Sequence, residues 1–288
     1  MSWFASSGLW RCAKSSYLEG ERSVTVWRYA RLYLEFVKQV LKVWLEYRVD
    51  FFIGALSTIV IQFASLLFVT VVFEHIQQLN GWSFYQILLI YGIAATGRSI
   101  HLIFFDNLWT LGWQYIRTGN FDRLLIRPIN PLFHLIADRI QQDGVGQLAI
   151  GLVVLIVAAT HDGTVWTPIN LSLLVLLILS SGVIFSAVNL FFATLSFWMV
   201  DSLPVIFATF SLSDFARYPL TIYNKGIRVL LTWIIPYGFT AFYPAASILE
   251  PAKFGLMALI TPLVAVICSV LAYLFWNVGL RAYTSTGN

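Results

Sequence analysis

Six long runs of this sequence contain no charged side chain. Asp, Glu, Lys and Arg are absent from residues 51–73, 75–97, 144–161, 163–200, 229–249 and 254–280. About 20 apolar residues are enough for a helix to cross the hydrocarbon core of a bilayer. Only 11% of the 288 residues are charged, against about 25% in an average soluble domain. The chain is therefore expected to be a membrane protein.

The apolar runs favour helices over a β-barrel. Backbone groups in lipid must hydrogen-bond within the protein, which leaves helices or a closed barrel as spanning structures. Barrel strands alternate apolar and polar residues, whereas these runs are continuous. We expect an all-α polytopic membrane protein, with spans at 51–73, 84–105, 144–160, 171–199, 203–223 and 255–277.

One further apolar stretch, residues 228–250, is interrupted by Pro236, Gly238 and Pro244. Irregular backbone at membrane depth is tolerated where it is buried in protein or lines a wet cavity. This pattern favours a re-entrant hairpin on the outer side, before the last span, over a seventh crossing.

Residues 24–49 carry charges at steps of three or four positions, which places them on one face of a helix. They are Arg28, Arg31, Glu35, Lys38, Lys42 and Glu46. Such a helix is typical of the membrane interface. The alternative is a helix packed on other protein, with this face in water.

The distribution of basic residues predicts the orientation, because cytoplasmic loops are enriched in Lys and Arg. With a cytoplasmic N-terminus, thirteen basic residues lie on that side and three, Lys225, Arg228 and Lys253, lie outside. The predicted parts are an N-terminal segment at 1–50, a transmembrane domain at 51–280 with a cytoplasmic connection at 106–143, and a cytoplasmic tail at 281–288. Residues 1–23 lack an apolar stretch of secretory length, so no cleaved signal peptide is expected.

The stretch RTGNFDRLLIRPINPLF, residues 117–133, interrupts the apolar sequence. Asn120 is expected to cap a helix of about two turns, which Pro128 and Pro131 then end. Its apolar side would consist of Phe121, Leu124 and Leu125. A helix this short is unstable alone in water, so it packs either on this protein's own helix ends or on a cytoplasmic partner.

These residues also carry a family resemblance. The segment YIRTGNFDRLLIRPINPLF is similar to the cytoplasmic loop of ABC-2 type transporter permeases, whose pattern is Arg-x-Gly-x-x-Asp-Arg-Leu-Leu-x-Arg-Pro. ARYPLTIY at 216–223 and IIPYGFTAFYPA at 234–245 also resemble that family. The similarity runs from about residue 28 to about residue 251.

The resemblance implies a permease subunit of an ABC exporter in a prokaryotic plasma membrane. Its architecture would be six transmembrane helices with an N-terminal interfacial (elbow) helix. Two permeases, identical or related, would act with two ATPase subunits that hold ATP and magnesium, so this chain would bind no cofactor. In that family the loop after the second span supplies a coupling helix that docks on the ATPase. Carried onto this sequence, the coupling residues are Arg117, Gly119, Phe121, Asp122, Arg123, Leu124, Leu125, Arg127 and Pro128.

Three charged residues lie inside predicted spans, where a charge costs roughly 2.5–3.5 kcal/mol on insertion scales. Arg98, Asp214 and Arg217 either line a translocation path or have structural roles. For Asp214 and Arg217 the structural role would be an ion pair. For Arg98 the favoured interpretation is extension to the interface. The nearby GIAATGRS, residues 92–99, resembles a phosphate-binding loop but is rejected, because no strand precedes it.

The alternative class is a polytopic membrane enzyme or lipid-modifying protein without an ATPase partner. It would need several polar groups at one depth, and Arg98, Asp214 and Arg217 are the candidates available. The four histidines are scattered without ligand spacing, and Cys12 and Cys268 suggest no disulfide framework, so neither metal nor catalytic site is expected. The net charge of +4 is attributed to topology and lipid attraction rather than to nucleic acid. The scarcity of charges in the spans suits an amphipathic, lipid-linked or bulky cargo better than a small ion.

Overall fold

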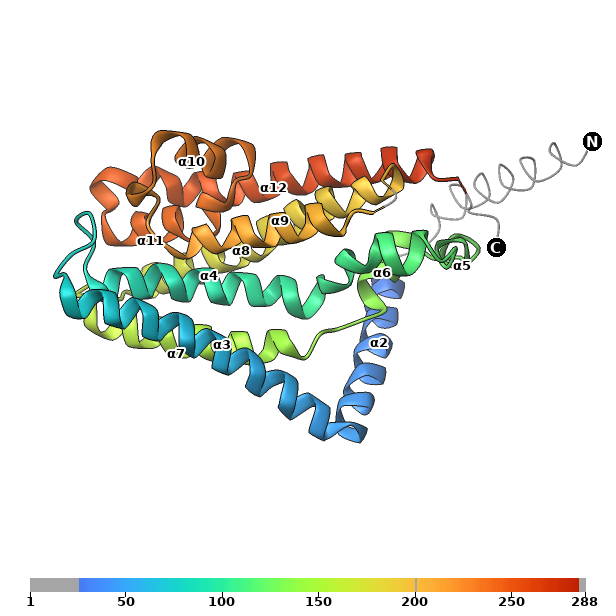
Figure 1. Cartoon of the computed structure of the whole chain (residues 1–288), viewed down its shortest axis with the longest axis horizontal. Helices are drawn as coiled ribbons and strands as arrows, with labels where there is room; N and C mark the ends of the chain where they lie inside the picture. Colours follow the sequence, from blue (N-terminus) through green and yellow to red (C-terminus); the bar gives the residue numbers. More distant parts are fainter. Residues whose placement is uncertain (1–25, 200, 285–288) are drawn as a thin grey trace, which may run out of the picture.

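The computed structural model describes residues 26–199 and 201–284. These residues form helices and short helical turns, with no β-strand among them. The long helices lie side by side in a bundle, and α2 crosses its end (Figure 1). The predicted all-α fold is confirmed for this part of the chain. Predictions for residues 1–25 and 285–288 lie outside it.

Five helices are long and apolar enough to cross a membrane in the described part of the chain. They coincide with five of the six predicted spans and are candidate membrane spans by their length and composition. They are α3 (Arg48–His75), α4 (Phe84–Phe104), α7 (Asp143–His161), α8 (Pro168–Thr194) and α12 (Pro251–Ala282), with α8 continued by the turn η4 (Leu195–Phe197).

Local sequence signals fix where several of these helices begin. Ser83 precedes α4 and forms a reciprocal capping pair with Gln86. The Ser83 side chain accepts a hydrogen bond from the backbone N–H of Gln86, and the Gln86 side chain accepts one from the backbone N–H of Ser83. Thr167 caps α8, whose first residue is a proline. Proline is favoured at this position, because its missing N–H would have no partner within the helix.

The fifth predicted span, 203–223, is shorter in the structure. Helix α9 (Leu203–Asp214) has 12 residues and is followed by the turns η5 (Phe215–Arg217) and η6 (Leu220–Ile222). At 1.5 Å per residue α9 is about 18 Å long, against about 30 Å of hydrocarbon. The physical reason is Pro219, which disfavours helical backbone at the preceding residue; Tyr218 is extended, with φ −120° and ψ 157°. The six-span count stays a prediction.

The proline-interrupted stretch forms short, broken elements. These are α10 (Lys225–Val229), the π-helical turn η7 (Leu230–Ile234), η8 (Tyr237–Thr240) and α11 (Phe242–Leu249). Ile235 is extended ahead of Pro236, which separates η7 from η8. This segment packs on α4, α8 and α12, at the opposite end of the bundle from α5 and α6 (Figure 1). Its re-entrant character in a bilayer stays a prediction.

Helix α4 lies at the centre of the bundle, in contact with α7, α8 and α11. Most of its side chains are buried, among them Ile87, Leu89 and Ile90. Glycines let α7 approach closely: a Cβ on Gly151 would be 2.9 Å from the Thr96 backbone nitrogen of α4. Small residues at helix contacts are typical of membrane proteins, where close backbone approach replaces the hydrophobic effect.

Helix α2 (Val26–Glu46) packs on α6 (Pro131–Ala137), which lies between α4 and α7 in the sequence. Its Tyr29 ring lies 4.8 Å from that of Phe133, and the Tyr29 hydroxyl accepts the Asn130 amide at 3.2 Å. Glu35 and Lys38, from the predicted charged face, form an exposed pair at 2.8 Å. The aromatic side of α2 therefore packs on the protein, and its position in a membrane interface stays a prediction.

Candidate functional site

The charged stretch 117–128 begins beyond the end of α4. Two short elements, η2 (Asp106–Thr110) and the π-helical η3 (Leu111–Ile116), lead to it. Gly119 has a φ of +73°, a backbone conformation that glycine adopts without steric cost. There the chain turns into α5 (Phe121–Leu125), which lies near α6 (Pro131–Ala137) at one end of the bundle (Figure 1).

The apolar side of α5 packs inside this chain. Phe121 is fully buried, with its ring centroid 4.8 Å from Tyr283 and 5.3 Å from Phe197, and Leu124 is buried in the same cluster. The Tyr283 hydroxyl donates to Asp122 at 3.1 Å. Of the two packing arrangements left open by the sequence, these side chains adopt the one against the protein's own helix ends.

The remaining residues of this stretch form an exposed surface, which we call the outer face. It consists of Arg117, Arg123, Ile126, Arg127 and Pro128. Ile126 is 76% exposed, in a segment whose neighbouring side chains are arginines. Single exposed aliphatic side chains are common on protein surfaces, so a docking role for this face stays a prediction.

The capping prediction for Asn120 is wrong. It occupies the position before α5, but with helical backbone, φ −63° and ψ −19°, and no capping bond. Its side-chain amide instead donates to the Gln114 carbonyl and the Thr118 hydroxyl. The capping asparagine is Asn130, whose side chain accepts two backbone N–H groups in the first turn of α6.

A chain of polar contacts runs from the outer face to the end of α4, and we call it the Arg127–Asn107 chain. Arg127 Nη1 lies 2.7 Å from His134 Nε2 in α6. Asp138, at the C-terminal end of the same helix, is 3.9 Å from that nitrogen, too far for a hydrogen bond, so the backbone of α6 joins the two halves of this chain. The Tyr115 hydroxyl donates to Asp138 at 2.7 Å, and Asn107 donates to Tyr115 at 3.2 Å.

The buried His134 is the central member of that chain. Burial and the adjacent Arg127 charge lower the pKa of His134 below its ordinary value. The imidazole is therefore neutral at pH 7 and accepts from the guanidinium. Sequence reasoning classed this histidine only as scattered. The available signal was the Asn130-Pro131 pair, which begins the helix that carries it.

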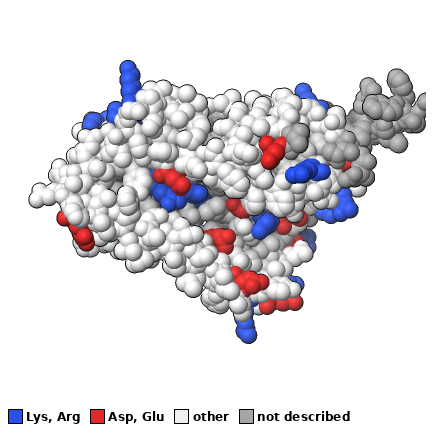
Figure 2. Space-filling model, in the orientation of Figure 1, with Lys and Arg blue, Asp and Glu red and all other residues white. Residues whose placement is uncertain are grey.

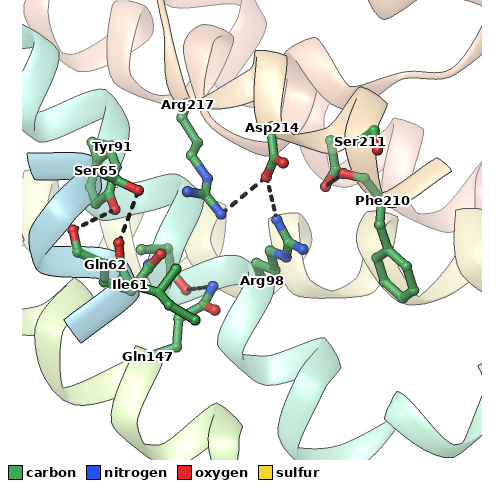
Figure 3. A network of polar contacts seen from close by, with 12 residues as sticks. Ile61, Gln62, Ser65, Tyr91, Arg98, Gln147, Phe210, Ser211, Asp214 and Arg217 are labelled. Carbon is green, nitrogen blue, oxygen red and sulfur yellow. Dashed lines mark hydrogen bonds and ion pairs between the residues drawn. The ribbon is translucent and has the colours of Figure 1, made fainter. Parts of the chain in front are cut away.

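Arg98, Asp214 and Arg217 meet between α4 and the end of α9 (Figure 3). Arg98 Nη1 is 2.7 Å and Arg217 Nη2 is 3.1 Å from the same oxygen, Asp214 Oδ1. We call these three residues the triad. Arg98 pairs with a residue 116 positions away, and its extension to the membrane interface stays a prediction.

Two aromatic rings flank the triad. The Arg217 guanidinium lies 5.8 Å from the Tyr91 ring centroid, and that of Arg98 lies 5.8 Å from the Phe210 centroid. The two arginine side chains are 16% and 17% exposed, whereas that of Asp214 is 55% exposed. Sequence reasoning missed Tyr91 and Phe210, because this chain has 36 Phe and Tyr residues and nothing in their spacing marks these two.

Charged side chains are sparse on the bundle face seen in Figure 2, and a small mixed cluster interrupts the uncharged surface. They are more frequent toward the end that carries α2, α5 and α6. The phosphate-loop look-alike, residues 92–99, lies within α4 and so has no loop to offer a phosphate. The described residues contain no group of three or more His, Cys, Asp or Glu that could hold a metal ion.

Comparison with known proteins gives one result. The model of the family described as ABC-2 family transporter protein matches residues 59–287. No curated protein and no solved structure matches the chain. The match covers most of the sequence, including α5, the triad and the broken segment before α12.

Proposed function

Because the chain belongs to the ABC-2 family of transporter proteins, and because its long apolar helices make it a multi-pass membrane protein, we propose that it is the permease subunit of an ATP-binding cassette exporter. Two permeases, copies or relatives, would form the translocation path between them. Two separate ATPase subunits would bind ATP and magnesium and hydrolyse the nucleotide.

The proposed topology has six spans in a prokaryotic plasma membrane. Helix α9 and the turns that follow it would form the short fifth crossing, and 228–250 the outer re-entrant hairpin. α2 would lie in the inner interface, and both termini would be cytoplasmic. The thirteen-to-three distribution of basic residues supports this orientation.

The observation that carries the proposal is the outer face of residues 117–128 together with its rigid attachment. The exposed side presents Ile126 between arginines, while the buried side is held by Phe121 against the ends of α8 and α12. Through α6, the Arg127–Asn107 chain attaches the same segment to η2, directly after α4. A closing ATPase that displaces this segment would move the inner ends of three helices together.

The test is Ile126→Asp in the chain co-expressed with its ATPase. The substitution places a carboxylate at an exposed site, so the permease should insert and purify at normal yield. The contact with the partner should be lost, because the apolar side chain is removed and the new carboxylate must be dehydrated in the interface. We expect ATPase co-purification and transport-linked ATP hydrolysis to fall at least tenfold.

The matched control is Val165→Asp, at an aliphatic residue of the α7–α8 loop that is 77% exposed. It lies at the opposite end of α7 from the 106–143 connection and should leave both readouts at the wild-type value. Unchanged ATPase association in Ile126→Asp would contradict the docking role of this segment.

A further inference from the structure

The triad carries an unbalanced charge. Two guanidinium groups share one carboxylate oxygen, which leaves one positive charge in excess. The neighbouring apolar runs 75–97 and 163–200 contain no acidic residue to balance it. An unpaired charge at membrane depth is unfavourable unless an opposite charge or water meets it.

Most of the hydrogen-bonding capacity of the triad is unused. Each guanidinium has five N–H donors in a planar fork. Asp214 is the acceptor found for Arg98 and Arg217 among the described residues. Arginine forks match the oxygens of carboxylates and phosphates, so the free donors are suited to an anionic group.

The triad is accessible. Asp214 is the exposed member, and the arginine side chains lie behind it, against Tyr91 and Phe210. The close-up shows both guanidinium groups pointing toward Asp214 from different elements (Figure 3). A ligand approaching from the Asp214 side would reach the guanidinium groups beside that carboxylate, since each arginine side chain keeps part of its surface exposed.

An apolar groove lies near the Arg217 side of the triad, although none of the three residues lines it. It has a volume of about 250 Å³ and is lined by side chains of α3, α4 and the η5–η6 segment, including Phe68, Val72, Ile87 and Ile222. Tyr218, the residue after Arg217, also lines it, and Ile87 is one helical turn from Tyr91. The groove offers no polar partner, so it suits a hydrocarbon group.

We propose that the triad and this groove bind an amphipathic molecule whose headgroup is an anion, a phosphate or a carboxylate. The anion occupies the free N–H donors of Arg98 and Arg217, and the hydrocarbon part lies in the groove. This inference rests on the proposed function, because it assigns the ligand as transported cargo.

The depth of the triad favours cargo over a resident bilayer lipid. Arg98 is 14 residues from the first residue of α4 and six from the last, which is about 21 Å and about 9 Å along the helix axis. Phospholipid headgroups lie outside a hydrocarbon core of about 30 Å. A headgroup at the triad therefore belongs to a molecule that is being transported.

The test is binding of dodecyl phosphate to the purified chain in a neutral detergent, followed by the shift in Tm. Dodecyl maltoside and dodecyltrimethylammonium have the same alkyl chain and serve as neutral and cationic probes. We expect stabilisation by dodecyl phosphate alone, and an apparent Kd at least tenfold weaker in Arg217→Gln. Lys225→Gln, an exposed cation outside the triad, should bind as the wild type does.

Asp214→Asn gives a readout of opposite sign. It removes the competing carboxylate and leaves both cations, so dodecyl phosphate should bind more tightly and raise Tm by more than in the wild type. Weaker binding in this variant, or equal stabilisation by the three dodecyl probes, would overturn the proposal.

The source of the anion is decided in nanodiscs. Dodecyl phosphate should stabilise the chain equally in phosphatidylcholine discs and in discs that also contain phosphatidylglycerol. Complete loss of the effect with phosphatidylglycerol would overturn the cargo assignment and make this a lipid site. None of these measurements involves the ATPase, so their failure and a failure of ATPase docking are independent results.

Discussion

Phe121 shows how one side chain decides the role of its neighbours. Its ring is in contact range of Phe197, Trp276 and Tyr283, so it joins α5 to one end of α8 and of α12. From sequence alone, Leu124 and Phe121 are as suitable for partner contact as Ile126. Burial separates them: a partner can reach Ile126 but not the other two.

Phe121→Ala should therefore destabilise the permease itself. Removing a fully buried ring leaves a cavity, and such changes cost about 3–5 kcal/mol. We expect a clearly lower Tm for the purified chain, in the absence of any ATPase. Ile126→Ala should shift the free energy of unfolding by less than about 0.5 kcal/mol, as exposed substitutions do. An equal loss in both variants would contradict the packing described for α5.

Asp106 is a buried carboxyl group at the start of η2, where the Trp109 indole donates to it at 3.1 Å. Burial raises the pKa of Asp106 from 3.8 to about 6. The folded state then binds this proton more tightly than the unfolded state, so stability falls as pH rises from about 4 to 6. The loss persists at pH 7.

Asp106→Asn should consequently stabilise the protein at pH 7, by on the order of 1–3 kcal/mol. The asparagine carbonyl can still accept from Trp109 while carrying no charge. The gain in Tm should shrink toward zero as pH is lowered to 4, where the aspartate is protonated in the folded state. A variant less stable than wild type at pH 7 would show that the carboxylate is needed in its ionised form.

At the scale of helices, contact between α4 and α7 depends on the absence of side chains. A Cβ at Gly151 would lie 2.9 Å from a backbone atom of α4, whereas one at Gly255 of α12 would meet no atom within 4 Å. Gly151→Ala should force α4 and α7 apart and lower stability by about 1–3 kcal/mol. Gly255→Ala should be neutral or stabilising by up to about 1 kcal/mol, from helix propensity. Melting of the two purified variants in the same detergent measures the difference. Equal melting temperatures would count against this interface.

The sequence was most informative about these helices. Long apolar runs without internal prolines predict α3, α4, α7 and α8, and the last such run predicts α12 despite Pro262. The early end of α9 could also have been predicted from the sequence, because Pro219 disfavours a helix at the preceding residue. The pairing of Arg98 with Asp214 could not be predicted from the sequence, because it depends on how α4 packs against a helix more than 100 residues away. Which side of α5 faces inward was equally hidden, since the same apolar stripe fits an internal or an external partner.

At the scale of the whole molecule, the two ends of the bundle should face opposite sides of the membrane. In a chain with both native cysteines replaced by serine, Val165→Cys should react in intact cells with an impermeant thiol reagent. Ile126→Cys should react only after permeabilisation. Both sites are exposed and avoid the positive φ of Gly119 and Gly163.

The same labelling tests the span count. Lys225→Cys and Lys253→Cys flank the broken segment 225–249, and both should react from outside if it enters and leaves on one face. Labelling of only one of them in intact cells would mean that this segment crosses, and the six-span topology would be wrong.

The π-helical turn η3 has a consequence for how this loop can vary. Arg117 N bonds to Gly112 O, five residues back rather than four, so the turn holds one residue more than an α-helical turn would. Each residue rotates a helix by about 100°. Loss of a single residue between Leu111 and Ile116 would turn α5 by roughly a quarter of a revolution and move Phe121 out of its cluster. In natural relatives, insertions and deletions should therefore avoid this one turn.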